Sequence, residues 1–194
     1  MSEPGPLRLF VALTPPPEAV AELRRAVEPV RDRFPELRWT APESWHVTVA
    51  FLGDVAPEIR PGLERRLGRV AARHPVQRVV LAHGGRFADR VLWMGVGGDV
   101  PGLQALAQGV SRASERSGVP VESRPWHGHV TLARASGRRR EYTLAAPAAL
   151  LADFAGAEWT AEALHLVHST IGAGPARYQD VAAWPLEGRP GRFR

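Results

Sequence analysis

The chain has 194 residues, of which 44% are hydrophobic and 23% are charged, a composition typical of a folded globular protein. It contains no Cys and no Lys, so all 25 of its Lys and Arg residues are Arg. These absences exclude disulfides, thiolate zinc sites, Cys nucleophiles, P-loop phosphate binding and ligases that work through a lysine adduct.

The formal net charge of +5 favours a polyanionic partner, above all RNA or a phosphate ester. A basic surface that only aids solubility explains the charge equally well. The sequence has no run of 18 or more apolar residues, so no transmembrane helix is predicted. Residues 1–6 lack the charged and apolar regions of a signal peptide. We therefore expect a cytoplasmic protein without membrane association.

Apolar periodicity predicts two strands and two helices in the first half of the chain. Pro29 is expected to bend or shorten the first helix, because proline removes a helical hydrogen bond. Gly53 and Asp54 are expected to end the second strand. The strands are predicted at residues 7–13 and 45–52, and the helices at residues 20–34 and 59–70.

The second half predicts more strands than helices. Gly84 and Gly85 are expected to form the loop between its first two strands, and Gly118 to end the longer helix. The strands are predicted at residues 76–82, 91–96, 129–133, 163–167 and 178–184, and the helices at residues 100–116 and 147–154. This irregular alternation predicts an α+β fold rather than a doubly wound parallel sheet.

Two of the predicted strands carry the same triplet. His46–Val47–Thr48 recurs as His129–Val130–Thr131, 83 positions later. Because alternate side chains of a strand share a face, each His lies beside its Thr while the Val points the other way. A third triplet, His168–Ser169–Thr170, lacks the branched middle residue and is interpreted as a strand end. Ordinary strand histidines are the alternative interpretation, but two copies in matching contexts favour a functional pair.

A pair of imidazoles suits displacement at phosphorus, which needs a base on one side and an acid on the other. Imidazole titrates near neutral pH and serves in either role. Thr48 and Thr131 would donate hydrogen bonds to the non-bridging oxygens, where negative charge develops. This chemistry requires no metal ion and no other cofactor. His127 and His129 also form an HxH pair, which leaves a metal-ligand pair as an alternative.

The two triplets and their flanks resemble the 2H phosphoesterases, and within them the RNA 2′,3′-cyclic phosphodiesterases, historically called 2′-5′ RNA ligases. The resemblance runs from Leu7 to Leu186. Members of the family usually carry Pro where this chain has Gly128. The segments that carry the resemblance are RLFVAL, RW, HVTVAFLGDV, RVLWMGV, HVTLAR and GPARYQDVAAWPL, at residues 8–13, 38–39, 46–55, 90–96, 129–134 and 174–186.

The resemblance implies a bilobal fold, in which two pseudo-symmetric antiparallel sheets with flanking helices leave an active-site cleft between the lobes. It implies hydrolysis of a terminal RNA 2′,3′-cyclic phosphate to a 2′-phosphomonoester, with reversible 2′-5′ ligation in some members. It assigns His46 as the general acid and His129 as the general base. The sequence alone does not distinguish these roles, because the two motifs are near mirror images.

Three further residues are expected to bind substrate. Arg134 would reach the phosphate, mostly on the strength of the resemblance, although strict alternation places it opposite His129. The strand must therefore end or bulge at that point. Tyr178 would stack on a base, and His127 would lie at the edge of the site. Trp45 and Trp126 flank the motifs, where they either line the site or pack in the core.

We expect one bilobal domain at residues 7–186, with flexible termini at residues 1–6 and 187–194, in a monomer. The expected partners are RNA ends or small cyclic-phosphate nucleotides. The basic run Arg138–Arg140 is expected to follow an RNA backbone or to be a solvated charge run. Two alternatives remain: the same chemistry on small cyclic nucleotides or ADP-ribose derivatives, and a non-catalytic nucleotide-binding module.

Overall fold

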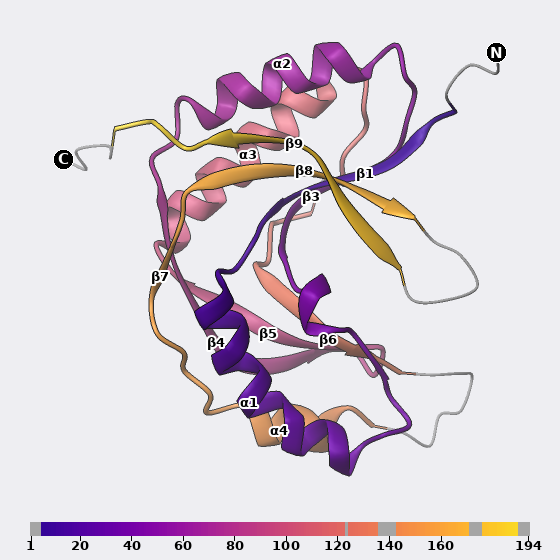
Figure 1. Ribbon diagram of the computed structural model, residues 1–194, viewed down its shortest axis with the longest axis vertical. Coiled ribbons are helices and arrows are strands. Elements are labelled where there is room, and N and C mark those ends of the chain that lie inside the picture. Colours follow the sequence, from indigo (N-terminus) through magenta and orange to yellow (C-terminus); the bar gives the residue numbers. More distant parts are fainter. Residues whose placement is uncertain (1–4, 123, 136–142, 171–175, 190–194) are drawn as a thin grey trace.

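The computed structural model describes residues 5–122, 124–135, 143–170 and 176–189. Its strands form two antiparallel sheets, sheet A and sheet B (Figure 1). Sheet A has the order β3-β1-β8-β9, with β1 at Leu7–Leu13, β3 at Val47–Val55, β8 at Ala163–Thr170 and β9 at Arg177–Pro185. Sheet B has the order β2-β6-β5-β4-β7, with β2 at Arg38–Trp39, β4 at Gln77–Phe87, β5 at Val91–Gly98, β6 at His129–Arg134 and β7 at Trp159–Ala161.

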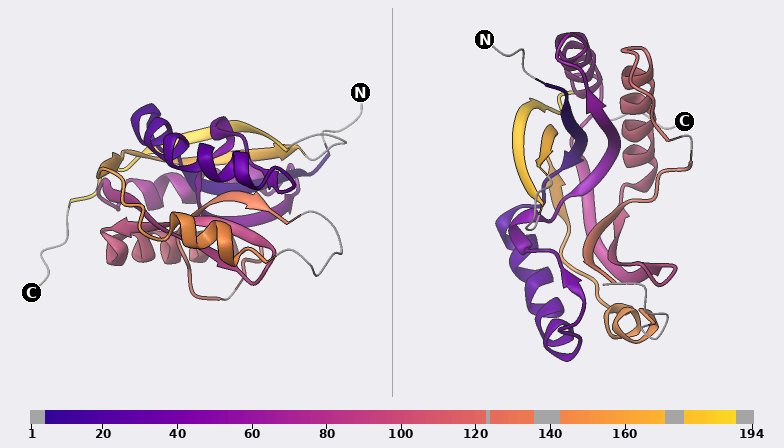
Figure 2. Two further views of the ribbon diagram at one scale, coloured as in Figure 1. Left: turned by 90° about the horizontal axis from the view of Figure 1, so that it is seen from below. Right: turned by 90° about the vertical axis from the view of Figure 1, so that its right-hand side faces the viewer.

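Each sheet is covered by helices. The helices α2 (Arg60–Ala71) and α3 (Val100–Glu115) pack side by side over sheet A. The helices α1 (Pro17–Arg33) and α4 (Ala145–Leu151) lie together on the sheet B side (Figures 1 and 2). This arrangement confirms the predicted α+β class. None of the helices in the described ranges is long and apolar enough to cross a membrane.

The main hydrophobic core runs through both sheets. The alternate residues of β1 belong to two different clusters. Leu9 and Val11 are part of the main core. Phe10 and Ala12, on the opposite face of β1, form a small second cluster with Val167 of β8. Sheet A therefore has one face toward the core and its helices, and another face that carries this small cluster.

The prediction that Gly53 and Asp54 end a strand is wrong, because β3 continues to Val55. Gly53 has a φ of +66°, a conformation that favours glycine. The pairing of β3 with β1 shifts register directly before this residue. Gly53 thus accommodates an irregularity within the strand rather than a turn.

The predicted loop at Gly84 and Gly85 is also wrong, because both residues lie inside β4. A Cβ atom at position 84 would lie 2.3 Å from the Cβ of Leu151, and one at position 85 would lie 2.3 Å from the Trp93 ring. These glycines therefore allow α4 and an indole to approach the sheet closely. The turn between β4 and β5 lies three residues later, where Ala88 has a φ of +47°.

The remaining predicted elements are confirmed apart from their end residues, and the short strands β2 and β7 were not predicted. Pro29 lies inside α1, which continues to Arg33 and is therefore not shortened. Gly118, with a φ of +80°, follows the end of α3 as predicted. The Arg138–Arg140 run lies outside the described residues, as do the parts of the expected flexible ends at residues 1–4 and 190–194.

Candidate active site

The two His-x-Thr motifs stand at the start of two strands that lie against each other, β3 of sheet A and β6 of sheet B. Val47 and Val130, the middle residues of the motifs, are fully buried in the core. Thr48 and Thr131 are half-buried on the opposite strand faces, as the alternation predicts. In the described part of the chain, neither Thr hydroxyl has a hydrogen-bond partner, so both are free to donate.

Both motif imidazoles are held by the same local hydrogen bond. The Nδ1 atom of His46 lies 2.8 Å from the carbonyl oxygen of Ser44, and the Nδ1 atom of His129 lies 2.8 Å from that of His127. A carbonyl oxygen only accepts, so Nδ1 must carry a proton and donate it in each ring. The neutral form of each ring therefore has its lone pair on Nε2, which is available for proton transfer.

The charge of His129 acts on the ring of His46. Burial lowers the pKa of His46, the hydrogen bond to Ser44 opposes this effect, and the charge of His129 lowers the pKa further. Burial also lowers the pKa of His129, against its hydrogen bond to the carbonyl of His127. The structure thus brings two partly buried imidazoles, 83 positions apart in the sequence, into one electrostatic environment.

His129 has cationic neighbours that His46 lacks. The charges of His127, Arg134 and Arg124 each lower the pKa of His129 further. Among the described residues, His129 is the only cation that lowers the pKa of His46. The cationic side of the site is therefore the sheet B side, where three cationic neighbours favour the neutral form of His129.

Each motif strand has a bulge at the same place. Pairing with β1 shifts register around Val49 of β3, and pairing with β5 shifts around Leu132 of β6. In both strands, two successive residues after the Thr are consequently buried. The bulge in β6 resets the alternation, so that Arg134 follows Thr131 on the exposed face. The expectation that the strand must end or bulge at Arg134 is confirmed, because β6 ends at Arg134 and its bulge lies two residues earlier.

Aromatic side chains pack around His46. The ring centroids of Phe10 and His46 are 4.5 Å apart, with the planes tilted by 30°. Tyr178 of β9 meets both rings edge-on, with centroid distances of 5.3 Å to Phe10 and 5.1 Å to His46. Tyr178 is 38% exposed, so part of its ring remains open to solvent beside the imidazole.

A second aromatic group surrounds His129. Phe87 of β4 meets the His129 ring edge-on at a centroid distance of 4.9 Å. His127 lies 6.2 Å from His129 and packs edge-on against Trp93 at 5.0 Å. His127 is exposed, so its ring lies at the outer edge of this aromatic group. Among the described residues, no third His, Asp or Glu joins His127 and His129 in a group that could hold a metal ion.

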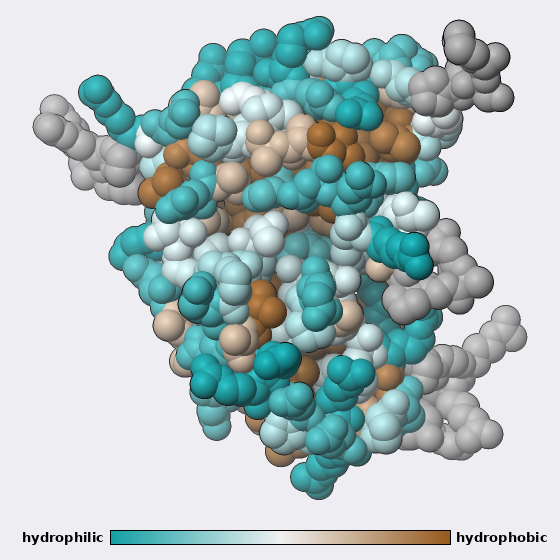
Figure 3. All heavy atoms as spheres, viewed as in Figure 1, coloured by the Kyte–Doolittle hydropathy of each residue, from teal (hydrophilic) through white to brown (hydrophobic). Residues whose placement is uncertain are grey.

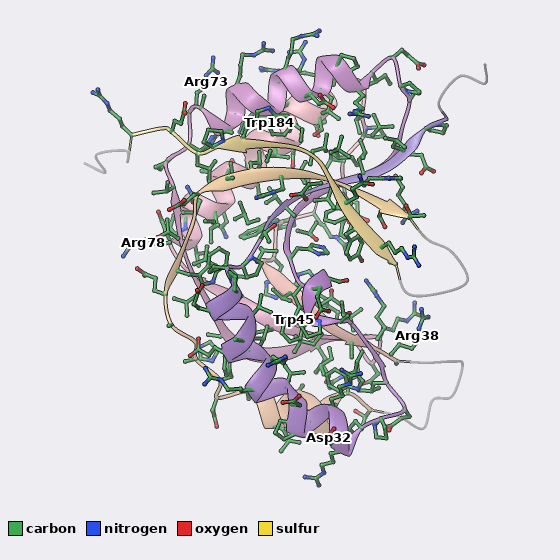
Figure 4. The ribbon with its side chains drawn as sticks, viewed as in Figure 1. Asp32, Arg38, Trp45, Arg73, Arg78 and Trp184 are labelled. Carbon is green, nitrogen blue, oxygen red and sulfur yellow. The ribbon has the colours of Figure 1, made fainter. Side chains whose placement is uncertain are left out.

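The two tryptophans near the motifs have different places. Trp45 is 4% exposed and packs in the core near the centre of the molecule (Figure 4). The Nε1 atom of Trp126 donates a hydrogen bond of 2.9 Å to the backbone oxygen of Thr48. This bond links the segment that precedes β6 directly to β3. A Cβ atom at position 128 would lie 2.5 Å from the Trp126 ring, so Gly128 leaves the space that this indole occupies.

The third triplet does not join the site. Strand β8 ends at Thr170, as expected for a strand end. Val167 and Ser169 lie on the face of sheet A that carries Phe10, so alternation places His168 on the other face. His168 therefore does not share a sheet face with His46.

Sequence reasoning missed several residues beside the motifs. Phe10, Phe87 and Trp93 contact the motif rings, but none of them stands near a motif in the sequence. Arg38 pairs with Arg134 across β2 and β6, so two cationic residues are neighbours at this edge of sheet B. These residues are brought beside the motifs by the pairing of strands, and a single sequence does not reveal that pairing.

Comparisons with known proteins agree with this geometry. Residues 14–172 match the model of the 2′-5′ RNA ligase superfamily. The chain is 33% identical over 190 residues to the RNA 2′,3′-cyclic phosphodiesterase of Escherichia coli K12, covering 96% of this chain and 99% of that protein.

Solved structures with the same fold are also found. A protein of Thermus thermophilus superposes with a TM-score of 0.79 at 25% identity, over 95% of this chain and 100% of that chain. Escherichia coli LigT complexed with 3′-AMP superposes with a TM-score of 0.73 at 30% identity, over 93% and 98% of the two chains. The family match covers most of the chain, and together with these relatives it shows that the chain belongs to the 2′-5′ RNA ligase superfamily.

Proposed function

We propose that the chain hydrolyses a terminal RNA 2′,3′-cyclic phosphate to a 2′-phosphomonoester with His46 and His129, and needs no metal ion. The observation that supports this most strongly is the matched pair of imidazoles, each held through Nδ1 by a backbone carbonyl. Relatives that carry the name RNA 2′,3′-cyclic phosphodiesterase, found at 29–33% identity over 93–96% of the chain, support the same activity.

In this reaction, Nε2 of His129 accepts a proton from water as the water oxygen attacks phosphorus. The bond between phosphorus and O3′ breaks, and the protonated Nε2 of His46 donates its proton to O3′. The product carries the phosphate on O2′, and the two imidazoles have exchanged protonation states. The cations around His129 support its role as the base, because they favour the neutral ring before the reaction.

The other site residues would stabilise the charge that builds up on the phosphate. Thr48 and Thr131 present free hydroxyls on the faces of the motif imidazoles, and these would donate to the non-bridging oxygens. Arg134 offers a guanidinium group whose paired donors match phosphate oxygens. Its exposed position after the bulge in β6 supports this role.

Tyr178 and His127 would contact the nucleoside part of the substrate. Both rings are exposed at the edges of the aromatic groups around the two motif imidazoles. Aromatic faces of this kind stack on bases. Escherichia coli LigT has been crystallised in complexes with 3′-AMP, ATP and NADP+, which supports nucleotide binding in this family.

Reversible 2′-5′ ligation is a second candidate, favoured by the name of the matching family. The 5′-hydroxyl of a second RNA would replace water as the nucleophile and give its proton to His129. The O3′ atom would leave with a proton from His46 as before, so that a 2′-5′ phosphodiester forms without ATP. The same site thus serves both reactions, and the concentration of RNA 5′-ends decides between them.

The test is incubation with an oligonucleotide that ends in a 2′,3′-cyclic phosphate, followed by identification of the product isomer. We expect a 2′-phosphomonoester, activity that survives EDTA, and loss of turnover in His46→Ala and His129→Ala. Loss of activity in EDTA would favour a metal site at His127 and His129. Wild-type ligand binding without turnover would favour a nucleotide-binding module. Faster turnover of small cyclic nucleotides than of RNA ends would favour the small-substrate alternative.

A further inference from the structure

Five of the arginines on or just after α2 and α3 form one group. Arg66 and Arg69 lie on α2, and Arg73 follows two residues after its end, so the three recur at helical spacing on one side. Arg112 lies on α3, and Arg116 directly follows the end of this helix. These two arginines are four residues apart and therefore also share one side. Figure 3 shows hydrophilic residues over α2, and Figure 4 shows Arg73 pointing away from the molecule at the end of this helix.

These five arginines line a single pocket of 240 Å³ between the two helices, which we call the arginine pocket. Small and apolar side chains from both helices complete its lining. Val70 comes from α2, whereas Gly109 and Ala113 come from successive turns of α3. Because Gly109 and Ala113 are small, the α3 side of the lining leaves room for a ligand to approach between the guanidinium groups.

The charge of the arginine pocket is not balanced by neighbouring acids. No Asp or Glu from the described part of the chain lines it. None of the ion pairs formed within the described ranges involves its five arginines, and the acidic Glu64 of α2 is bonded to Arg60 instead. Five like charges around one pocket repel one another, and an anion with several charges relieves that repulsion.

A histidine adds a further hydrogen-bonding group. His74 lines the arginine pocket, and its Nδ1 atom donates to the carbonyl oxygen of Val70 at 2.8 Å. A Cβ atom at position 109 would lie 3.0 Å from Cε1 of this ring and 3.5 Å from Nε2. Gly109 therefore lets the imidazole lie close to α3, with Nε2 left free for a ligand.

The arginine pocket is separate from the candidate active site. The helices α2 and α3 cover the core face of sheet A, whereas Phe10, which contacts His46, belongs to the cluster on the opposite face. Figure 2 shows α2 and α3 together on one side of sheet A. A ligand in the arginine pocket would therefore not compete with a phosphate between the two motifs.

We infer that the arginine pocket binds the sugar-phosphate backbone of the RNA whose end is processed, away from the reacting terminus; this rests on the proposed function. Arginine forks match phosphate oxygens, and five of them across two helices exceed what a single phosphate engages. A chain of phosphates spaced along a backbone fits this extended array. Long structured RNA would then bind at two places, whereas a short oligonucleotide would reach only the motif site.

The test compares two variants that each lose three positive charges. R69Q/R73Q/R112Q removes three of the four exposed arginines of the arginine pocket, and R24Q/R25Q/R31Q removes three exposed arginines of α1 as the matched control. The probes are an RNA stem-loop and a trinucleotide, both ending in a 2′-phosphate that the enzyme does not turn over. Fluorescence anisotropy gives the affinity over a series of salt concentrations, and thermal unfolding checks that both variants are folded.

We expect R69Q/R73Q/R112Q to bind the stem-loop about tenfold or more weakly than the control, with a logarithmic salt slope smaller by roughly 2. Both variants should bind the trinucleotide as the wild type does. Hydrogen exchange should show protection of residues 66–73 and 109–116 by the stem-loop only. Equal stem-loop affinity in the two variants would overturn the inference, and binding of an acidic protein there instead would do so as well.

These readouts do not depend on turnover. If the stem-loop protects α2 and α3 but no cyclic phosphate is hydrolysed, the proposed function fails while the arginine pocket remains an RNA site. If hydrolysis of a short cyclic-phosphate substrate is normal in all variants and stem-loop binding is unaffected, the proposed function stands and the arginine pocket is not an RNA site.

Discussion

Phe51 and Arg134 occupy equivalent positions in the two motif strands, each five residues after its motif His and directly after a bulge. Both side chains are exposed, but one is aromatic and the other is cationic. Phe51 packs toward Phe10 at a centroid distance of 6.0 Å, whereas the charge of Arg134 acts on His129. The backbone of the site is thus nearly symmetric, and its side chains give it an apolar half and a cationic half.

Substitution of either motif His should remove most of the activity. In the proposed mechanism each imidazole transfers one proton, so His46→Ala or His129→Ala should lower kcat by about 10²–10⁴-fold. The double variant should lose less than the product of the two single losses, because the groups act together. Rates on a cyclic-phosphate dinucleotide measure this, with His168→Ala as the control. A wild-type rate in either single variant would contradict the assignment.

The pH dependence of kcat/KM should be bell-shaped, with its maximum below pH 6.5. One imidazole must be neutral and the other protonated, and both pKa values lie below the ordinary value of 6.5. The maximum of the profile lies between these two lowered pKa values. It therefore lies below pH 6.5. Initial rates at substrate concentrations well below KM give this profile. A maximum on the alkaline side of 7 would be incompatible with it.

The same lowered pKa values predict that acid destabilises the fold. The unfolded chain binds protons at its imidazoles more readily than the folded chain does, so the stabilising effect of neutral rings is complete above pH 6.5. It is lost as the pH falls from 6.5 through the lowered pKa values. Urea unfolding over this range should therefore show a shallower loss of stability in the variant H46Q/H129Q than in the wild type.

Arg134→Gln should weaken catalysis and shift the pH profile in a defined direction. Loss of the guanidinium group removes a phosphate contact, for which we expect kcat/KM to fall by about 10-fold or more, since a charged hydrogen bond contributes roughly 1.5–3 kcal/mol. Removal of a cation that lowers the pKa of His129 should also raise that pKa, so one limb of the profile should move to higher pH. Phe51→Leu is the control, and it should leave both limbs in place.

Gly128→Ala should destabilise the protein and disturb the link between the two motif strands. The added methyl group would collide with the Trp126 ring, whose Nε1 bonds to Thr48. Overpacking of this kind costs roughly 1–3 kcal/mol of stability. Gly62→Ala on α2 is the matched control, because a Cβ there would lie 3.9 Å from the one neighbour in reach, the end of the Arg65 side chain. Urea unfolding compares the two, and equal stabilities would show that the ring moves freely.

The sequence predicts much of this fold because its strands and helices have strong apolar patterns. Val47 and Val130 alternate with half-buried partners, and that alternation is what the structure shows. The glycines at 84 and 85 misled the prediction, because glycine serves close packing as well as turns, and only the position of Leu151 and Trp93 distinguishes the two. The short strand β7 was not predicted, because the residues around it carry no pattern that indicates a strand.

The site was predictable only in part for a related reason. Repetition of the triplet identifies His46 and His129, since both copies lie in similar strand contexts. The aromatic residues around them come from β1, β4, β5 and β9, and the sequence holds no local trace of these contacts. The position of the bulge in β6 depends on strand pairing and could not be predicted from the sequence. The sequence predicted only that β6 must end or bulge if Arg134 is to lie on the same side as His129.

The passage of the chain back and forth between the sheets has a consequence for how the protein acquires its structure. Sheet A joins β1 to β8, and the two strands are about 150 residues apart, so neither lobe is complete until nearly the whole chain has been synthesised. Such non-local pairing slows folding, because distant segments must meet before any contact between them is gained. Fragments ending before β8 would leave β1 with an unpaired edge, prone to aggregate. Truncation or splitting between the lobes is therefore not a route to a working half-enzyme.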